Sequence, residues 1–373
     1  MIWDCGMPGK ALLIVNSLAG GGAERVCVYL ANAMAQFAEV DMAILYDDDE
    51  APDMRGVNVV PLGMARRAGK AAKIAQLAAA RKRLNRLVAD RERDGRYGLI
   101  AAHLTASHVV ASLSHVADRC LYVHHSLPVA IERLYPTPLL GCLKRVYRRG
   151  QSVSVSDGVR RQAIECFGVP IENIATIYNC VPLDGVRDGK DEPIDQARPF
   201  ILCVGRLAPS KRFDRMVKAY AEGGFAKDYD LVFLGQGQLE GELKAQATAL
   251  GVGATVRFPG YVDNPYAWMS KSSAMVMTSD REALPTVLVE GLMAGARVVS
   301  ADCDFGPREV LTGELADFLV PQDSIKGYID AIRRALHDYP APDSDYFVRY
   351  RADEVIRRYV ERYRTAFSDR KGA

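Results

Sequence analysis

The chain has 373 residues and a formal net charge of +2, with 49% of its residues apolar and 25% charged. This length suggests two domains or one large α/β unit, and no apolar run reaches the roughly 18 residues that span a bilayer. The short N-terminal apolar run at 11–15 runs into a glycine loop, and the eight cysteines form no Cys-x-x-Cys pair. We therefore expect a cytoplasmic protein with reduced thiols, and neither a zinc site nor a disulfide framework.

The first half of the sequence alternates predicted strands and helices. A β-rich run at 10–18 is followed by glycines and by a segment with apolar residues at helical spacing. Further strands are predicted at 40–46, 98–104, 120–125 and 152–156. This alternation favours a parallel sheet with helices on both faces.

Residues 64–96 carry eleven basic and three acidic side chains. Apolar residues recur there at roughly helical spacing, so we predict a helix with one apolar face. Its basic face could contact an anionic membrane, or it could be an ordinary solvated surface. A nucleic-acid partner is not expected, because no aromatic residues lie between the basic ones. The apolar positions are Ile74, Leu77, Leu84, Leu87 and Val88.

Residues 179–199 are polar and turn-rich, and they are the best candidate for a domain boundary. Strands are then predicted at 200–205, 230–235, 254–260, 273–279 and 296–302, with an amphipathic helix at 352–367. We expect an N-terminal domain at 1–185, a C-terminal domain at 198–354 and a helix at 355–373 that crosses back to the first domain. Two such parallel-sheet domains facing one another would form a central cleft at the carboxyl ends of their strands.

Two strand–helix junctions have the chemistry of phosphate binding. Gly21 and Gly22 precede a helix, where backbone amides can approach an anion, although a simple tight turn explains them equally well. Neither the dinucleotide-binding nor the Walker glycine spacing is present. Arg206 and Lys211 follow a buried strand in "VGRLAPSK", and two cations there suit a diphosphate. The alternative is a pair of exposed charges without a partner.

The stretch "TSDREALPTVLVEGLMAG" at 278–295 contains an unusual carboxylate. Pro285 fits the first turn of a helix and Gly295 fits its end, so Glu290 lies on a helix with no polar face. A buried carboxylate is costly unless it accepts hydrogen bonds, either from an arginine or from the hydroxyls of a ligand. Glu282 precedes the same helix, where the amides of Leu284, Thr286 and Val287 are expected to be free.

With these motifs the sequence resembles the retaining glycosyltransferases of family 4, which have the GT-B fold of two Rossmann-like domains. The resemblance rests on "GGAERV", "VSDGVRRQAIECFGVPIENIATIYNCV", "VGRLAPSK" and Glu282-x7-Glu290 running on into "VVSADCDFGPREVL". Ala283 stands where the family usually has glycine. The resemblance implies a donor site for a nucleotide sugar and no protein nucleophile.

The resemblance also assigns expected roles to individual residues. Glu290 would bind the ribose and Glu282 the donor sugar, while His125, or else its neighbour His124, would face that sugar. Arg206 and Lys211 would neutralise the diphosphate, and Gly260 and Tyr261 would hold the base. Gly21 and Gly22 match the N-terminal glycine loop of the family. The backbone of Leu284, Pro285, Thr286 and Val287 would contact the sugar and the phosphate.

The expected reaction is transfer of a sugar, with retention, from a UDP-hexose or UDP-N-acetylhexosamine to a saccharide or lipid-linked acceptor in bacterial cell-surface glycan synthesis. A GDP-mannose-dependent mannosyltransferase and a non-catalytic sugar-nucleotide-binding subunit are the alternatives. No metal or other cofactor is expected, because Arg and Lys would supply the positive charge. The acidic runs at 47–49 and 302–304 are therefore not interpreted as metal motifs. The protein would lie in the cytoplasm or peripherally on the inner membrane face.

Overall fold

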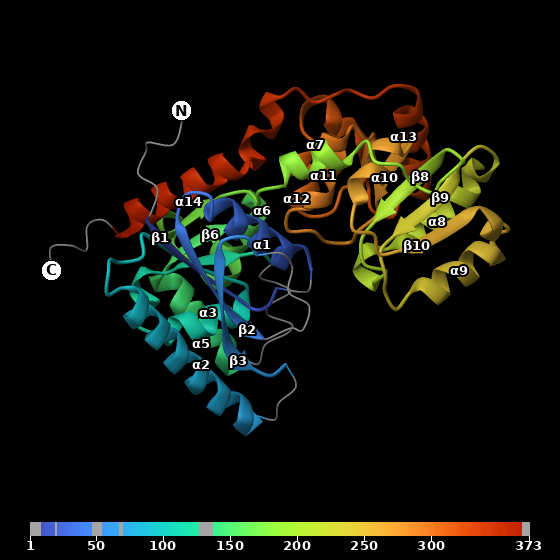
Figure 1. Cartoon of the computed structure of the whole chain (residues 1–373). Coiled ribbons are helices and arrows are strands. Elements are labelled where there is room, and N and C mark those ends of the chain that lie inside the picture. The colour runs from blue at the N-terminus through green and yellow to red at the C-terminus, as the bar shows by residue number, and fades with distance from the viewer. Residues whose placement is uncertain (1–8, 19–20, 47–53, 67–69, 127–136, 368–373) are drawn as a thin grey trace. The chain divides into compact units, whose positions relative to one another are not determined.

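The structure is a computed structural model, and it describes residues 9–18, 21–46, 54–66, 70–126 and 137–367 (Figure 1). Its contacts divide the chain into two units. Unit 1 comprises Met1–Val181 and Arg349–Ala373, and unit 2 comprises Pro182–Val348. Within the described ranges, no helix combines the length and the apolar character needed to cross a membrane.

Unit 1 is built on a seven-stranded, all-parallel sheet with the order β3-β2-β1-β4-β5-β6-β7. Helices cover both faces of the sheet (Figure 1), so its central strands are largely apolar and buried. Five residues of β1 in succession, 11–15, are buried for this reason. The strands are β1 (Lys10–Val15), β2 (Glu39–Tyr46), β3 (Val57–Met64), β4 (Leu99–His103), β5 (Leu121–His124), β6 (Gln151–Ser154) and β7 (Ile174–Thr176).

The helices of unit 1 begin and end where the sequence supplies caps. Ser156 accepts a hydrogen bond from the amide of Val159 at the start of α6, and Gly168 ends that helix with a left-handed φ of 66°. The helices are α1 (Gly22–Met34), α2 (Lys70–Arg91), α3 (Thr105–Ser112), α5 (Thr137–Arg149), α6 (Asp157–Phe167) and α14 (Ala352–Phe367). The last of these packs against α1 and β4, although it is the most distant in sequence.

Unit 2 contains a six-stranded parallel sheet with the order β10-β9-β8-β11-β12-β13. Its strands are β8 (Phe200–Val204), β9 (Asp230–Leu234), β10 (Val256–Gly260), β11 (Ala274–Met277), β12 (Val298–Ala301) and β13 (Leu319–Val320). Its helices are α7 (Leu183–Gly189), α8 (Phe213–Glu222), α9 (Glu240–Ala249), α10 (Pro265–Lys271), α11 (Thr286–Ala294), α12 (Gly306–Val310) and α13 (Ile325–His337).

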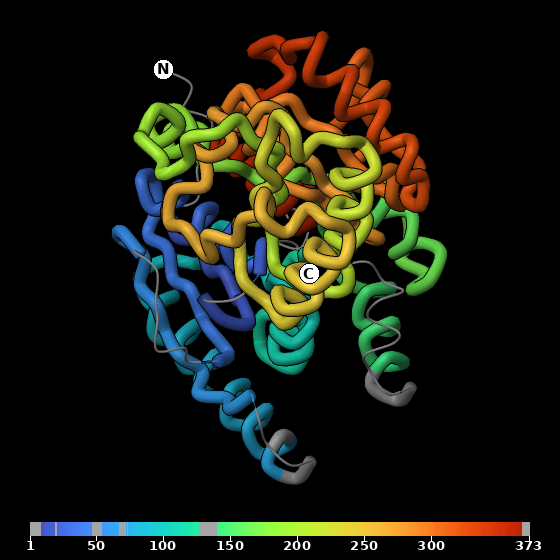
Figure 2. The backbone as a smooth tube through the Cα atoms, turned by 90° about the vertical axis from the view of Figure 1, so that its right-hand side faces the viewer, coloured from blue at the N-terminus to red at the C-terminus, as the bar shows by residue number. Residues whose placement is uncertain are grey.

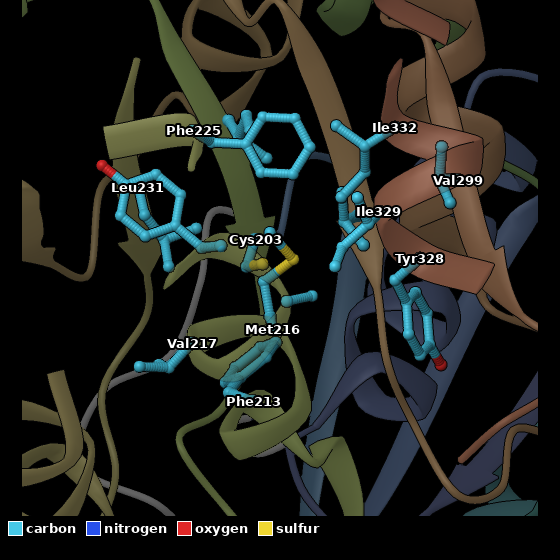
Figure 3. Close-up of a cluster of buried hydrophobic side chains, with 14 of the residues drawn as sticks. Cys203, Phe213, Met216, Val217, Phe225, Leu231, Val299, Tyr328, Ile329 and Ile332 are labelled. Carbon is cyan, nitrogen blue, oxygen red and sulfur yellow. The ribbon is translucent and has the colours of Figure 1, made fainter. Parts of the chain in front are cut away.

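The core of unit 2 lies between the sheet and the helices α8 and α13. Figure 3 shows Cys203 of β8 among Phe213 and Met216 of α8, with Ile329 and Ile332 of α13 beside them. All five side chains are buried. This packing fixes the start of α8, and therefore the loop that joins β8 to it.

The chain passes from unit 1 to unit 2 after Val181 and returns after Val348. The two crossing segments are joined on the unit 1 side by a hydrogen bond from the amide of Val181 to the carbonyl of Tyr350, at 3.0 Å. The polar stretch at 179–199 is not a featureless linker, because α7 lies within it and packs against α10 and α11 of unit 2.

Helix α2 lies on the outside of unit 1 in both views (Figures 1 and 2), and it bears out the predicted basic helix only in part. Leu84 and Val88 are buried, as expected. Ile74 is 70% exposed, so its expected place on the buried face was wrong. Apolar residues keep their helical spacing through the first turns of α2. The start of this helix extends beyond the sheet (Figure 1), so no strand of the described residues covers it there. Residues 57–64 form strand β3, which the sequence did not predict.

Candidate active site

The predicted donor residues of unit 2 lie at or after the carboxyl ends of three strands of the sheet, β8, β10 and β11. From β8 the sheet continues to β9 on one side and to β11 on the other, so the loops after β8 and β11 diverge at this point. In open parallel sheets, ligands bind at such a topological switch point. Arg206 and Lys211 follow β8, and Glu282 follows β11.

Lys211 and Glu282 meet across the switch point. The ammonium Nζ of Lys211 donates to Oε1 of Glu282 at 2.7 Å, and the side chains are 22% and 15% exposed. This partly buried pair holds one positive and one negative group at the strand ends. Arg206 is exposed and makes no ion pair with any described residue. The structure therefore brings Lys211 to Glu282 but not Arg206.

The loop between β8 and α8 differs from the expected helix start. Lys211 ends a short 3-10 turn, Pro209–Lys211, and α8 begins only at Phe213. Between them Arg212 has a φ of 48°, a left-handed conformation that is uncommon for a residue with a side chain. This turn lets Lys211 point back toward Glu282 instead of along the helix.

A hydrogen-bond network ties the two loops together. The guanidinium of Arg215, which is 6% exposed, donates from Nη1 to the carbonyl of Thr278 at 3.1 Å and to Oδ1 of Asp280 at 2.7 Å. The hydroxyl of Thr278 donates to the carbonyl of Lys211 at 2.9 Å. Gln322 donates to the carbonyl of Asp280 at 2.6 Å. Together these bonds fix the segment that carries Glu282.

The prediction that Glu290 is buried is confirmed, since this residue of α11 is 8% exposed. Gly295 ends the helix in a left-handed conformation with φ 87°, also as expected. Pro285 was expected in the first turn, and this was wrong: it precedes the helix, because its ψ of 91° is extended. Thr286 and Val287 therefore form the first helical positions, where amides have no carbonyl partner inside the helix.

The segment after β12 packs against the loop that carries Glu282. Glu282 pairs with Phe305 in an isolated parallel bridge. A Cβ on Gly306 would lie 2.6 Å from the Cδ of Pro285 and 2.8 Å from the carbonyl oxygen of Ala283, so only glycine fits there. Asp302, in the acidic run 302–304, forms an ion pair with Arg308.

Strand β10 ends at Gly260, which has a φ of 86°, and Tyr261 beyond it is 65% exposed. Gly235 directly follows the neighbouring strand β9, and its amide donates to the carbonyl of Gly260 at 2.8 Å. A Cβ on Gly235 would lie only 2.1 Å from the carbonyl oxygen of Gly205. The strand ends of β8, β9 and β10 are thus in close backbone contact.

In unit 1, the predicted glycine loop leads directly into helix α1. Gly21 precedes the helix, and its amide donates to Oε2 of Glu24 at 3.0 Å. Gly22 is the first helical residue, and it is exposed. Gly20 lies outside the described residues.

Four buried histidines cluster at the ends of β4 and β5. Nδ1 of His103 and Nε2 of His125 are 2.9 Å apart, which makes one of them the donor. His124 contacts the hydroxyl of Ser152 through Nε2 at 3.2 Å. His108 bonds to the Tyr147 hydroxyl at 2.8 Å and to two backbone carbonyls.

Burial makes these rings neutral. It lowers the pKa of His125 to about 4 and, together with the neighbouring His125, the pKa of His124 to about 3. Each ring therefore carries one donor and one acceptor nitrogen near neutral pH. His124 is the last residue of β5, and His125 follows the strand.

Comparison with known families divides the chain at the same place as the structure. A family model described as "Glycosyltransferase Family 4" matches residues 20–184, and one described as "Glycosyl transferases group 1" matches residues 187–351. The chain belongs to the family 4 glycosyltransferases. One matched region lies in unit 1, and the other lies almost wholly in unit 2.

Two curated relatives of the chain are named as transferases of bacterial origin. One, from Campylobacter jejuni, is N-acetylgalactosamine-N,N'-diacetylbacillosaminyl-diphospho-undecaprenol 4-alpha-N-acetylgalactosaminyltransferase. It is 30% identical over 49% of this chain and 50% of its own length. The other is the lipopolysaccharide 1,6-galactosyltransferase of Salmonella typhimurium, 25% identical over 49% of this chain and 52% of its own length. The chain thus spans about half the length of the relatives it matches.

Solved structures confirm the expected GT-B fold of the chain. HepE of Anabaena in complex with UDP and glucose superimposes with a TM-score of 0.74, at 18% identity over 94% of this chain and 98% of that chain. The lipopolysaccharide outer core galactosyltransferase WaaB gives a TM-score of 0.66, at 17% identity over 97% and 99% of the two chains. At these identities the likeness shows the fold.

Sequence reasoning did not assign a role to Arg215 or to His103. Arg215 is 65 residues from Asp280, and His103 is 22 residues from His125. An arginine on the buried side of α8, among apolar neighbours, is the one local signal for the first. For His103 the signal is its place at a strand end beside the strand that leads to His125.

Proposed function

We propose that this protein transfers a sugar, with retention of the anomeric configuration, from a UDP-hexose or UDP-N-acetylhexosamine to a saccharide or lipid-linked acceptor. The observation that carries the proposal is the pairing of Lys211 with Glu282 at the switch point of unit 2, followed by the buried Glu290 on α11. Family membership and the relatives' lipid-linked and lipopolysaccharide acceptors support the acceptor class.

Each donor contact follows from the chemistry of a side chain. A ribose presents two neighbouring hydroxyls, and a carboxylate such as Glu290 accepts a hydrogen bond from each. The exposed Arg206 and the ammonium of Lys211 would neutralise the diphosphate, with the first amides of α11, at Thr286 and Val287, adding donors. Glu282 would accept from the sugar hydroxyls.

The reaction requires stabilisation of charge that develops on the leaving diphosphate and on an oxocarbenium-like sugar. Lys211 is held in place before the donor binds, so it loses little conformational freedom in the transition state. No protein nucleophile is proposed. The leaving phosphate oxygen would accept the proton of the acceptor hydroxyl, and the new glycosidic bond would form on the face from which the diphosphate departs.

His125 is proposed to contact the donor sugar. Its ring is neutral, because burial lowers the pKa to about 4, so it would donate or accept one hydrogen bond without adding charge. The Nε2 atom of His125 lies 2.9 Å from Nδ1 of His103, so this nitrogen already has a hydrogen-bond partner. His124 is the less suitable choice, since it lies inside β5 and is 2% exposed, against 9% for His125.

The donor class is tested by thermal unfolding with UDP-, GDP-, ADP- and dTDP-sugars, using the full chain and the variants Glu290→Gln and Glu242→Gln. Glu242 lies on the surface helix α9, so it controls for the loss of one charge. A rise in melting temperature with UDP-sugars that Glu290→Gln weakens and Glu242→Gln keeps is expected. A rise with GDP-mannose alone would favour the mannosyltransferase alternative.

Retention and catalysis require a separate measurement. Product formed from a UDP-sugar and a membrane-derived acceptor should show the anomeric configuration of the donor by NMR, and chelation of divalent metal should leave the rate unchanged. A Glu282→Gln variant that binds donor and turns over as the wild type would contradict the proposed role. Donor binding with no transfer to any acceptor would favour a non-catalytic sugar-nucleotide-binding subunit.

A second proposal concerns α2, which we infer lies against anionic lipid at the inner membrane face. Arg81, Lys82 and Arg86 are exposed on this helix, and so is Ile74. Arg83 is excluded from this set, since its guanidinium donates to the carbonyl of Leu62 at 2.7 Å. Basic side chains beside an apolar one suit a headgroup region.

Sedimentation with vesicles containing an anionic lipid tests this surface. Changing Arg81, Lys82 and Arg86 to glutamate should release the protein, whereas vesicles of neutral lipid should not bind it. The matched control makes the same charge change at three exposed lysines of unit 2, and unaltered sedimentation of both variants would refute the proposal. The control lysines are Lys218, Lys227 and Lys326.

A further inference from the structure

A cysteine and two histidines from three separate elements of unit 1 meet in its interior. Cys27 comes from α1, His103 ends β4, and His125 follows β5. One ligand atom from each lies within 4.8 Å of the other two, and all three residues are buried. They are 76 and 22 positions apart in the sequence, so the fold alone brings them together.

Two ring nitrogens in this cluster lack a hydrogen-bond partner among the described residues. These are Nε2 of His103 and Nδ1 of His125, both buried. The nearby His108 provides the contrast, because both of its nitrogens are bonded to protein groups. A buried polar atom without a partner costs free energy. A ligand that binds these two nitrogens of the Cys27–His103–His125 cluster would remove this cost.

We propose that Cys27, His103 and His125 bind a thiophilic monovalent cation, Cu(I). A thiolate with two imidazoles is a soft donor set without a carboxylate, which favours copper or zinc over magnesium or calcium. Charge then separates these two ions. Cu(I) with one thiolate is neutral, whereas Zn²⁺ would leave a net positive charge in the interior, and burial of an unpaired charge is costly.

Coordination number supports the same choice. Structural zinc is almost always bound by four ligands, and the described residues gather three here. At metal–sulfur and metal–nitrogen distances of about 2.0–2.3 Å, the donor atoms around one ion lie roughly 3.5–4 Å apart. The present separations of up to 4.8 Å therefore require only a small rotation of the side chains.

Binding changes the cluster in a defined way. The Cys27 thiol loses its proton to solvent as the sulfur–copper bond forms, and each imidazole gives one lone pair. The ion is not a cofactor of the transfer. Because His125 would be occupied, and His125 is proposed to contact the donor sugar, Cu(I) would slow the reaction. This last step alone rests on the proposed function.

Direct binding is measured first, without any assay of activity. Reduced protein carrying Cys142→Ser, which removes an exposed thiol, is titrated anaerobically with Cu(I) against bicinchoninate as the competing ligand. One tightly bound copper per chain is expected, and X-ray absorption should show one sulfur and two imidazole nitrogens. A copper surrounded by sulfur alone, or no binding beyond that of the competitor, would overturn the proposal.

The variants Cys27→Ser and His103→Asn should each weaken Cu(I) binding by at least about 100-fold. Cys203→Ser is the matched control, since Cys203 is equally buried but lies in unit 2. Thermal unfolding confirms that each variant is folded, and the absorption measurement on the intact cluster does not depend on the variants. Unchanged affinity in both variants would refute the site, and preferential binding of Zn²⁺ by the same residues would refute the choice of ion.

The effect on transfer is measured last. Cu(I) should inhibit the protein with an intact Cys27, and Cys27→Ser should retain its basal rate and lose this sensitivity. Binding without inhibition would keep the copper site and contradict the role of His125. Absence of any transfer, with copper bound as expected, would count against the proposed function and leave the site intact.

Discussion

In unit 2 two candidate residues are charged and paired with each other, whereas the candidate histidines of unit 1 are neutral and buried. Lys211 and Glu282 form an ion pair at the strand ends, and Arg215 anchors the loop that carries Glu282. His103 and His125 share a hydrogen bond in the interior, and two of their nitrogens have no partner among the residues that the structure describes. The strand ends of unit 2 thus present charged groups to an anionic ligand, whereas the histidine cluster of unit 1 presents nitrogen atoms that can coordinate a metal ion.

The largest effect is expected for the charged region. Replacement of Lys211 by methionine should lower kcat by roughly 10²–10³-fold, because a positioned cation at the leaving group is lost. The control is Lys218→Met, which removes an exposed charge of α8. Steady-state kinetics compare kcat of the two variants. Equal values would show that the Lys211 ammonium does not stabilise the leaving group.

Arg215 provides a test that does not depend on activity. Arg215→Met should lower the free energy of unfolding of unit 2 by about 3 kcal/mol, since Asp280 and the Thr278 carbonyl lose a buried partner. Arg212, which is 34% exposed, also contacts Asp280, and Arg212→Met should cost less than about 1 kcal/mol. The fluorescence of buried Trp268 follows the unfolding of this unit, and similar losses in both variants would show that the network does not anchor the loop.

Unit 1 also contains a charged pair, and its contribution should depend on pH. Burial alone would raise the pKa of Glu92, but hydrogen bonds from Arg119 and from the Tyr97 amide outweigh it, so the pKa is lowered. The stabilisation is therefore complete above the unfolded pKa of about 4.3 and is lost as the pH falls through the folded value.

Glu92→Gln should cost about 1–2 kcal/mol at pH 7 and much less at pH 3. Urea unfolding followed by circular dichroism at the two pH values measures the difference. Glu39→Gln serves as the control, since this glutamate is 59% exposed and pairs with Arg91 at 3.5 Å. A cost for Glu92→Gln that is the same at both pH values would contradict the assignment of the ion pair.

The smallest effect concerns the end of α11. Gly295→Ala should destabilise unit 2 by about 1 kcal/mol, because φ is 87° there. Gly241, inside α9, has open space around its Cα, and Gly241→Ala should stabilise by about 0.5–1 kcal/mol. Unfolding followed by Trp268 fluorescence should therefore show changes of opposite sign in the free energy of unfolding of the two variants.

Much of the fold and of the donor region could be predicted, because those features are local in the sequence. Alternating apolar runs indicate the parallel sheets, and an apolar helix with one carboxylate indicates that Glu290 is buried. The position of Pro285 was wrong by one residue because its φ suits a helix while its ψ is set by the packing of Gly306 against it. Arg215 and the Cys27–His103–His125 cluster depend on contacts between distant segments, which periodicity does not report.

The return of the chain to unit 1 has a consequence for how the protein is made. Unit 2 is a continuous segment, Pro182–Val348, whereas unit 1 needs Arg349–Ala373 to complete it. During synthesis the ribosome therefore releases every residue of unit 2 before unit 1 can receive α14. The segment translated first is the last to be completed, and until then the surfaces of α1 and β4 that α14 covers stay open to chaperones and proteases.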